Sequence, residues 1–261
     1  MKKMKIITIV GGCGHIGLPL SIILAVKGFK VISYDKNLSS LSKIKKNKMP
    51  FMETGGNKFL AKAIKSGRLS FTSSLKEEMK KGDFIITIGT PVDEFLNPST
   101  SSFKKCINEL KPYISNNKLV ILRSTVSPGV TDWLSKYLNN GKKNILVSFC
   151  LERVVQGKTF EEISKIPQII AGTTKKANLE SAKIFKKITK KIIYCSPKEA
   201  ELSKLYSNAF RYIQFAISNQ FYMLADEYGF NFHKIRSLMT ESYPRAQALP
   251  GSGFAAGPCL F

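Results

Sequence analysis

The chain has 261 residues, 43% of them hydrophobic, which is enough for one large globular domain or for one domain and part of another. Lysine and arginine number 41 against 18 acidic residues, a formal net charge of +23. Because the lysines are spread along the chain without an arginine-rich arm or a helix-turn-helix signature, we expect a basic surface and no nucleic-acid partner, and no apolar run approaches the ~18 residues of a membrane span.

The first predicted elements are a strand, a glycine-rich turn and a helix. Ile6–Val10 is a β-branched run typical of a buried parallel strand. A G-x-G-x-x-G pattern follows and opens a helix that we expect to end at Val26. The first glycine allows a tight turn, the second lets a pyrophosphate touch the backbone, and the third lets helix and strand pack closely. The predicted phosphate contacts are Gly12, Gly14, His15, Ile16 and Gly17.

The second predicted strand, Val31–Tyr34, ends in Asp35, which lies 23 residues after Gly12. An acidic residue at this distance accepts hydrogen bonds from the adenosine ribose hydroxyls and repels a 2′-phosphate. We therefore expect NAD as the cofactor in preference to NADP, a preference that the neighbouring Lys36 weakens. The same pattern also fits FAD.

Strands and helices alternate up to residue 196. The further predicted strands are Leu69–Thr72, Asp83–Ile88, Leu119–Leu122, Asn144–Val147, Gln168–Gly172 and Lys191–Cys195. The predicted helices are Asn37–Lys48, Phe59–Lys65, Phe103–Ile114, one opened by Pro128, and Ala177–Lys187. This alternation indicates an α/β fold with a Rossmann-like, doubly wound parallel sheet, and we assign residues 1–196 to an NAD-binding domain.

Two segments that follow predicted strands are candidate walls of the cofactor pocket, because ligands bind beyond the carboxyl ends of parallel strands. The first contains Thr90 and Pro91, after the strand at Asp83–Ile88. The second begins at Arg123 and contains Thr125.

Lys198–Tyr228 has no helix breaker and would form a helix roughly 45 Å long. Its apolar residues cover nearly the whole circumference, which is typical of a helix buried on all sides. One small domain cannot surround it. We therefore assign residues 197–261 to a central helical region and expect a homodimer through the helix at 198–228.

Three residues of this region could take part in chemistry. Lys204 and Asn208 are one helical turn apart and share a face, so they could stabilise an anion or serve only structure. Cys259 follows a segment rich in glycine and alanine, whose amides could surround a thiolate. The other cysteines are expected in the core. Five widely spaced cysteines without C-x-x-C favour a reducing cytoplasm, with no disulfide framework and no metal site.

The motifs, taken in order, resemble those of the UDP-glucose/GDP-mannose dehydrogenase family. Val10–Pro19 resembles V-G-x-G-Y-I-G-L-P, Gly89–Pro91 stands where the family has a P-T-P-type loop, Arg123–Thr131 resembles K-S-T-V-P-x-G-T-T, Leu151–Lys158 resembles P-E-R/F-x-x-x-G, Ala200–Phe210 resembles E-x-x-K-x-x-x-N, and Gly251–Cys259 resembles G-x-G-x-G-G-x-C. The match runs from near residue 5 to the last residue.

The resemblance implies oxidation of a sugar-nucleotide primary alcohol, most readily of a UDP-sugar, to a uronic acid by two hydride transfers to NAD. Cys259 would capture the intermediate aldehyde as a thiohemiacetal, which is oxidised to a thioester and then hydrolysed. Lys204 and Asn208 would stabilise the developing oxyanions. Glu152 would activate water that Thr125 orders.

The resemblance also implies that Arg245 binds substrate near a dimer interface, and that Glu152 and Arg153 contact the substrate. Leu151 departs from the family pattern, where proline is usual, and the chain ends at Phe261, where the family continues with a Lys-Asp pair and a nucleotide-holding domain. We therefore expect a truncated chain that binds cofactor with little turnover. The alternatives are a non-catalytic NAD-binding remnant that only dimerises, and a hydroxyacid-type NAD dehydrogenase that needs no cysteine.

Overall fold

The computed structural model of the chain describes residues 4–90, 100–141 and 143–254. The chain divides into two compact units, residues 1–202 and residues 203–261. The first unit is an α/β domain, and the second is helical.

The first unit alternates strands with helices. Its strands are β1 (Ile6–Val10), β2 (Lys30–Tyr34), β3 (Leu69–Thr72), β4 (Asp83–Ile86), β5 (Leu119–Leu122), β6 (Leu146–Phe149), β7 (Gln168–Gly172) and β8 (Ile192–Tyr194). Its helices are α1 (Gly17–Val26), α2 (Leu38–Lys45), α3 (Gly56–Lys65), α4 (Thr100–Leu110), α5 (Val130–Asn139), α6 (Thr159–Glu162) and α7 (Lys175–Phe185), with short 3-10 helices η1 (Glu77–Lys81) and η2 (Lys111–Tyr113).

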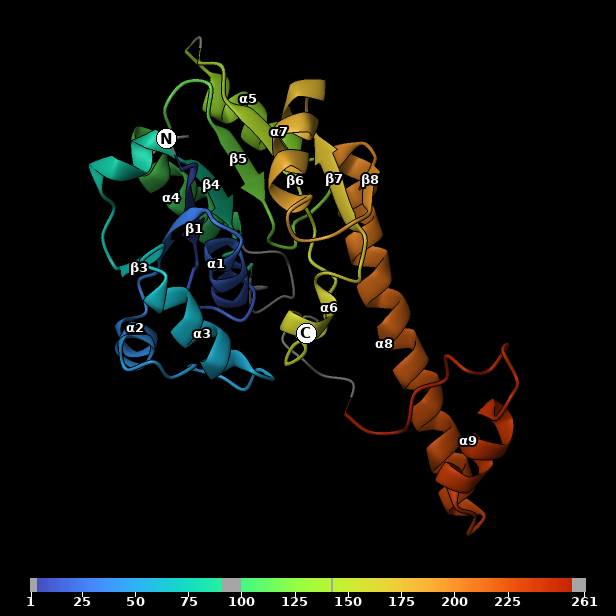
Figure 1. The fold of residues 1–261 in the computed structure, drawn as a ribbon. Helices are drawn as coiled ribbons and strands as arrows, with labels where there is room; N and C mark the ends of the chain where they lie inside the picture. The colour runs from blue at the N-terminus through green and yellow to red at the C-terminus, as the bar shows by residue number, and fades with distance from the viewer. Residues whose placement is uncertain (1–3, 91–99, 142, 255–261) are drawn as a thin grey trace. The chain divides into compact units, whose positions relative to one another are not determined.

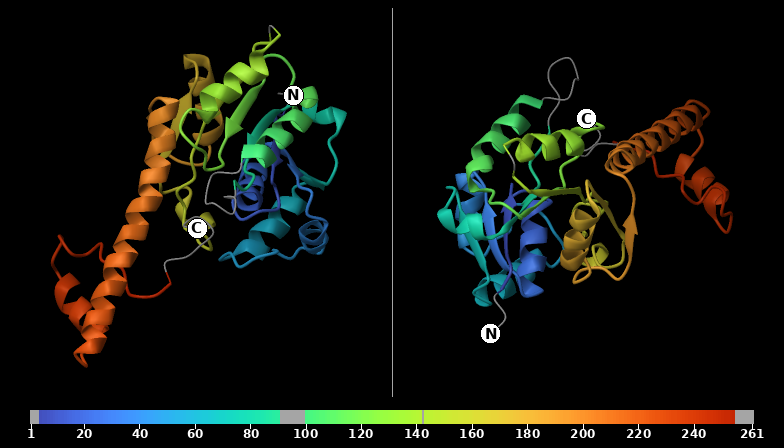
Figure 2. Two further views of the ribbon diagram at one scale, coloured as in Figure 1. Left: turned by 180° about the vertical axis from the view of Figure 1, so that it is seen from behind. Right: turned by 90° about the horizontal axis from the view of Figure 1, so that it is seen from above.

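The eight strands form one sheet in the order β3-β2-β1-β4-β5-β6-β7-β8. Helices cover both of its faces (Figures 1 and 2). Every residue of β4, β5 and β6 is buried, as expected for strands that are covered on both sides. The Rossmann-like, doubly wound fold predicted from the sequence is therefore confirmed.

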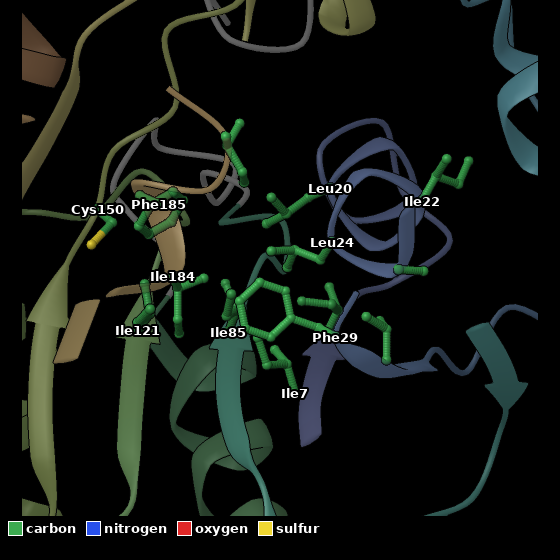
Figure 3. Close-up of a cluster of buried hydrophobic side chains, with 14 of the residues drawn as sticks. Ile7, Leu20, Ile22, Leu24, Phe29, Ile85, Ile121, Cys150, Ile184 and Phe185 are labelled. Atoms are coloured by element: carbon green, nitrogen blue, oxygen red, sulfur yellow. The ribbon is translucent and has the colours of Figure 1, made fainter. Parts of the chain in front are cut away.

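Two hydrophobic cores fill the space between the sheet and these helices. Neighbouring residues of a strand point to opposite faces, so Phe84 and Ile85 of β4 belong to different cores. The core shown in Figure 3 joins Ile85 and Ile121 to Leu20 and Leu24 of α1 and to α7 residues such as Phe185. The opposite core lies under α4 and α5. Together they fix the carboxyl ends of the central strands.

The strand β7 runs antiparallel to β6, whereas the other neighbouring strands of the sheet are parallel. A parallel crossover requires a connection, usually a helix, that returns the chain to the other end of the sheet. The segment between β6 and β7 contains only the four-residue helix α6. The chain therefore enters β7 at the carboxyl end of β6, which corrects the expectation of a wholly parallel sheet.

The predicted boundaries are confirmed for β1, β3, β5 and β7 and shift elsewhere. The sixth strand begins at Leu146 instead of Asn144, because the Asn144 amide donates to the Asn116 side chain and the Ile145 amide to the Asn139 side chain, both at 2.6 Å. These bonds take the amides that a strand would use. The helix expected from Phe103 to Ile114 becomes 3-10 at Lys111–Tyr113, where Pro112 interrupts it.

The second unit is built on α8 (Pro197–Glu227), which begins in the first unit, and α9 (Phe232–Thr240). The long helix is present as predicted, but the described residues do not bury it on all sides. Its exposed apolar side chains include Tyr206, Phe210, Tyr212, Ile213, Ile217 and Phe221. Among the described residues, no helix is both long enough and apolar enough to cross a membrane.

Candidate functional site

The inner side of the glycine turn between β1 and α1 leaves no room for side chains. A Cβ at Gly12 would lie 2.2 Å from the Ser33 hydroxyl oxygen, and one at Gly17 would lie 2.1 Å from the Gly11 carbonyl oxygen. The third glycine therefore allows close packing, as predicted. The left-handed position is Gly11, with φ +79°, one residue before the three-glycine pattern.

Gly14 is the open position of the same turn. Within 4 Å, a Cβ there would meet only one described neighbour, the Gly11 carbonyl oxygen at 3.4 Å. The Gly14 carbonyl accepts the Leu18 amide at 2.9 Å, so it belongs to the first turn of α1. Free amides at a helix start attract anions, and the space beside Gly14 suits a pyrophosphate.

The Asp35 carboxylate lies against the glycine turn. It accepts the Cys13 amide at 2.9 Å with one oxygen and the Asn37 amide at 2.9 Å with the other. The residue is half-buried, and each carboxylate oxygen has a further lone pair. The Asp35 carboxylate therefore lies beside the expected phosphate site, where it could accept hydrogen bonds from the ribose hydroxyls of a bound dinucleotide.

His15, at the outer edge of the turn, packs on Phe51 with ring centroids 4.1 Å apart. Partial burial lowers the pKa of His15, against an opposing effect of Glu53. The Glu53 carboxylate also accepts the amides of Gly157 at 3.2 Å and Thr159 at 2.6 Å. The segment around Glu53 therefore joins the glycine turn to the loop before α6, a link that the sequence analysis does not include.

The segments that follow β4 and β5 are hydrogen-bonded to each other. Thr90 donates its hydroxyl to the Thr125 carbonyl oxygen, and Ser124 donates to the Ile88 carbonyl oxygen, both at 2.6 Å. Thr90 and Thr125 are thus brought together at the carboxyl end of the sheet, as the pocket-wall prediction requires. Pro91 lies outside the described residues.

A buried ion pair lies where β5 and β6 end. The Arg123 guanidinium donates to one Glu152 oxygen through Nε at 3.1 Å and through Nη2. Its Nη1 also donates to the Cys150 carbonyl oxygen at 2.9 Å and to Gln168 at 3.0 Å. The other Glu152 oxygen accepts the amides of Arg153 at 2.7 Å and of the next residue. Sequence reasoning missed this partner of Glu152.

The pairing affects what Glu152 can do. Burial by itself would raise the pKa of Glu152, but the Arg123 guanidinium and the amides of Val154 and Arg153 hold that pKa below its ordinary value of 4.5. A carboxylate held in this way is a weak proton acceptor. In this arrangement Glu152 anchors the backbone at residues 152–154.

Glu201, at the start of α8, is a second buried carboxylate that sequence reasoning left without a role. It accepts the Gly129 amide at 2.6 Å, the Thr131 amide at 2.8 Å and the Thr131 hydroxyl at 2.6 Å. A carboxylate is favourable at a helix N-terminus, here that of α5. Its position in the E-x-x-K motif is the signal that could have identified it.

In the second unit, Lys204 and Asn208 lie one turn apart on α8. At 100° per residue, Ser218 and Asn219 lie within about 60° of Lys204 around the helix. The Ser218 hydroxyl donates to the Pro250 carbonyl oxygen at 2.7 Å, and Asn219 bonds the backbone of Gly253 at 2.8 and 3.0 Å. The segment that leads toward Cys259 is therefore fixed to the side of α8 that carries Lys204 and Asn208.

The other two predicted site residues of this unit are less well defined. Arg245 is exposed, with its guanidinium 5.9 Å from the ring centre of Tyr243. Cys259 lies outside the described residues.

The described cysteines lie in surroundings that disfavour the thiolate. Burial raises the pKa of Cys13 to about 12, of Cys106 to about 11 and of Cys150 to about 12. Cys13 and Cys150 are buried core residues as predicted, whereas Cys106 and Cys195 are half-buried and pack against the opposite core. Among the described residues, no group of His, Cys, Asp and Glu could hold a metal ion.

Comparison with known proteins identifies the same family that the sequence motifs resemble. Residues 4–192 match the NAD binding domain of the UDP-glucose/GDP-mannose dehydrogenase family, and residues 198–260 match its central domain. The UDP-N-acetyl-D-mannosamine dehydrogenase of Methanocaldococcus jannaschii is 34% identical over 255 residues, which are 95% of this chain and 58% of that protein.

Two solved structures have the same fold. The UDP-D-ManNAc dehydrogenase of Pyrococcus horikoshii aligns with a TM-score of 0.89 at 29% identity, over 98% of this chain and 62% of that one. A ternary complex of GDP-mannose dehydrogenase from Pseudomonas aeruginosa aligns with a TM-score of 0.82 over 93% of this chain and 58% of that one, but at 21% identity it shows the fold alone. The chain spans about three fifths of these proteins. Since two family models together match nearly the whole of it, the chain belongs to the UDP-glucose/GDP-mannose dehydrogenase family.

Proposed function

We propose that this chain provides the cofactor-binding and central parts of an NAD-dependent nucleotide-sugar 6-dehydrogenase, which converts a primary alcohol to a carboxylate. The observation that supports this most is the glycine turn. It leaves one open position, Gly14, at the start of α1, and the Asp35 carboxylate lies against the same turn. The chain's own residues thus fit the phosphates and the ribose of a dinucleotide.

Each part of the first unit has a defined role in this proposal. The amides of His15 and Ile16 hold the pyrophosphate beside Gly14, whose own amide donates to the Gly11 carbonyl oxygen at 3.1 Å, and Asp35 holds the ribose. Thr90 and Thr125, joined at 2.6 Å, form the wall beside the reacting end. NAD, when bound, accepts the hydride that leaves the substrate carbon.

The second unit would provide the groups that act on the substrate. Lys204 and Asn208 would donate hydrogen bonds to the oxygen on the reacting carbon as negative charge develops there. Gly253 is bonded to Asn219, and Cys259 follows six residues later.

Cys259 would make the reaction a four-electron oxidation. Its thiolate adds to the aldehyde carbon and forms a thiohemiacetal, which keeps the intermediate bound. The carbon of this thiohemiacetal still carries the hydrogen that leaves as the second hydride. The resulting thioester is cleaved by water to release the acid and regenerate the thiol. Thr125 remains our candidate for ordering that water.

We assign Glu152 a positioning role in place of the water-activating role expected from the family. Its pairing with Arg123 and its lowered pKa favour a fixed carboxylate over a proton acceptor. It would hold Arg153, whose amide it accepts at 2.7 Å, at the substrate side of the sheet. Arg245 would contribute a further cation to the nucleotide.

We also propose that the chain forms a homodimer through α8. The exposed apolar side chains of this helix include Tyr206, Phe210 and Ile213, which are 67%, 61% and 55% accessible. A second copy would bury them. A well-behaved monomer in sedimentation at micromolar concentration would argue against this interface.

The first substrate to test is UDP-N-acetylmannosamine, because the similar archaeal proteins are named as dehydrogenases of this sugar nucleotide. The assay follows NADH release with this compound and, in turn, with UDP-glucose, UDP-N-acetylglucosamine and GDP-mannose. The proposal predicts two NADH per sugar in a version that spans the full length of the relatives. Cys259→Ser in that version should stop acid formation, because an alkoxide is harder to generate than a thiolate.

The same assay separates the alternatives. A non-catalytic remnant would bind NADH and release none with any sugar. A hydroxyacid-type dehydrogenase would also release none with these sugars, but it would release one NADH per molecule of a hydroxy acid added in their place and would tolerate Cys259→Ser. Its only support is the likeness at 17% identity to a 3-hydroxyisobutyrate dehydrogenase of Mycobacterium tuberculosis, which shows the fold alone.

A further inference from the structure

Lys36 directly follows Asp35 at the carboxyl end of β2, beside the expected ribose. A cation at such a place can bind the 2′-phosphate that distinguishes NADP from NAD. In the structure this cation already has a partner, because the Lys36 Nζ lies 2.6 Å from the Glu109 carboxylate of α4. The two residues are 73 positions apart in the chain, so only the fold brings them together.

The two neighbours at the end of β2 turn to different partners. The Asp35 carboxylate bonds the Cys13 amide of the glycine turn, whereas Lys36 reaches α4. The hydrogen bond to Glu109 raises the pKa of Lys36, against a smaller effect of its burial, so the amine stays charged. The side chains are 64% and 34% exposed, so water and ligands reach the pair.

We propose that Glu109 is a specificity-determining residue, which holds Lys36 on α4 and thereby disfavours NADP. The inference rests on the proposed function, because it assumes that a dinucleotide occupies the glycine turn. A 2′-phosphate would have to break the pair and approach a second carboxylate. NAD has no group at that position and is unaffected.

The test measures dissociation constants of NADH and NADPH by fluorescence with the 261-residue chain, at low ionic strength because exposed charges are screened by salt. Exposed ion pairs contribute up to ~1 kcal/mol, so Glu109→Gln should tighten NADPH binding by about three- to fivefold. NADH binding should stay within experimental error. The double variant Glu109→Gln/Lys36→Met should lose the gain, because the released cation is gone.

Glu77→Gln is the matched control. It removes the same charge from another exposed pair, Lys80–Glu77, which lies in η1 just before β4 and thus at the opposite end of the strands. It should leave the affinity for both cofactors unchanged. Equal tightening by Glu77→Gln would mean that net charge alone is responsible and would overturn the proposal.

The outcomes distinguish this inference from the proposed function. Normal NADH binding with no change in NADPH affinity in Glu109→Gln would overturn the role of Glu109 alone. A gain that persists in the double variant would do the same, because Lys36 would not be the cause. If the parent chain binds neither cofactor, the proposed function fails and this inference with it.

Discussion

Two acidic residues, Asp35 and Glu152, follow strands of the same sheet, but their surroundings differ. Asp35 is half-buried and bonded to two backbone amides. Glu152 is 7% exposed and shares one oxygen with the Arg123 guanidinium. Glu152 also accepts two backbone amides, so the difference lies in the guanidinium and in the burial: Asp35 stays accessible to a ligand, whereas Glu152 is enclosed with its cation. The motif predicts an acid at both positions and does not distinguish these two uses.

The largest expected effect comes from removing the cation that pairs with Glu152. Arg123→Met leaves the buried Glu152 carboxylate without a guanidinium, which should lower the free energy of unfolding by about 3–5 kcal/mol. Urea unfolding measures this. Lys183→Met, which breaks an exposed pair with Glu180, is the control and should cost at most about 1 kcal/mol. Equal losses in both variants would contradict the distinction between the regions.

A change in the glycine turn beside Asp35 should instead weaken cofactor binding and leave the stability of the fold unchanged. Gly14→Val places a side chain where the pyrophosphate approaches, and we expect NADH affinity to fall by at least about 100-fold, which is ~2.7 kcal/mol. Thermal unfolding should change little, because a Cβ there meets one described atom at 3.4 Å. Retained binding would show that the cofactor does not lie at this turn.

A milder change sharpens the role of Asp35. Asp35→Asn keeps the size of the side chain and one acceptor oxygen but removes the charge that repels a 2′-phosphate. The NADPH dissociation constant should fall by about tenfold, equivalent to ~1.4 kcal/mol. Titration of both cofactors checks this. If the parent chain already binds NADPH as tightly as NADH, Asp35 is not the ribose ligand.

The smallest effect concerns acid stability. Since the folded-state pKa of Glu152 is depressed, its stabilisation is complete above its ordinary value of 4.5 and is lost as the pH falls through the lowered value. Urea midpoints measured between pH 3 and pH 6 should therefore decline more steeply for the parent chain than for Glu152→Gln. Parallel declines would mean that the ion pair contributes nothing to this pH dependence.

The sequence predicts the parts of the molecule that depend on neighbours in the chain. The strand Ile6–Val10, the glycine turn and Asp35 lie within 30 residues, and their chemistry follows from their order. The long helix α8 follows from the absence of breakers. The fold was therefore accessible without a structure, and the cofactor side of the candidate site rests on the same local order of residues.

The parts that the sequence does not predict depend on contacts between distant segments. Glu152 meets Arg123 across 29 residues, and Glu53 meets Thr159 across 106. No local pattern marks such partners, because any of 41 cations could pair with any of 18 acids. The reversal of β7 has the same origin. The direction of β7 depends on which end of the sheet the chain has reached after α6, and the residues of the strand itself do not determine it.

The strand order places β8 at one edge of the sheet. This edge strand has only three residues, two of which, Ile193 and Tyr194, are exposed. An apolar edge strand can invite another chain to add a strand. Here the length of the edge limits such pairing, and Lys190 and Lys191, both exposed, precede it with like charges on every copy. Basic residues at this position therefore disfavour edge-to-edge pairing between copies of the chain.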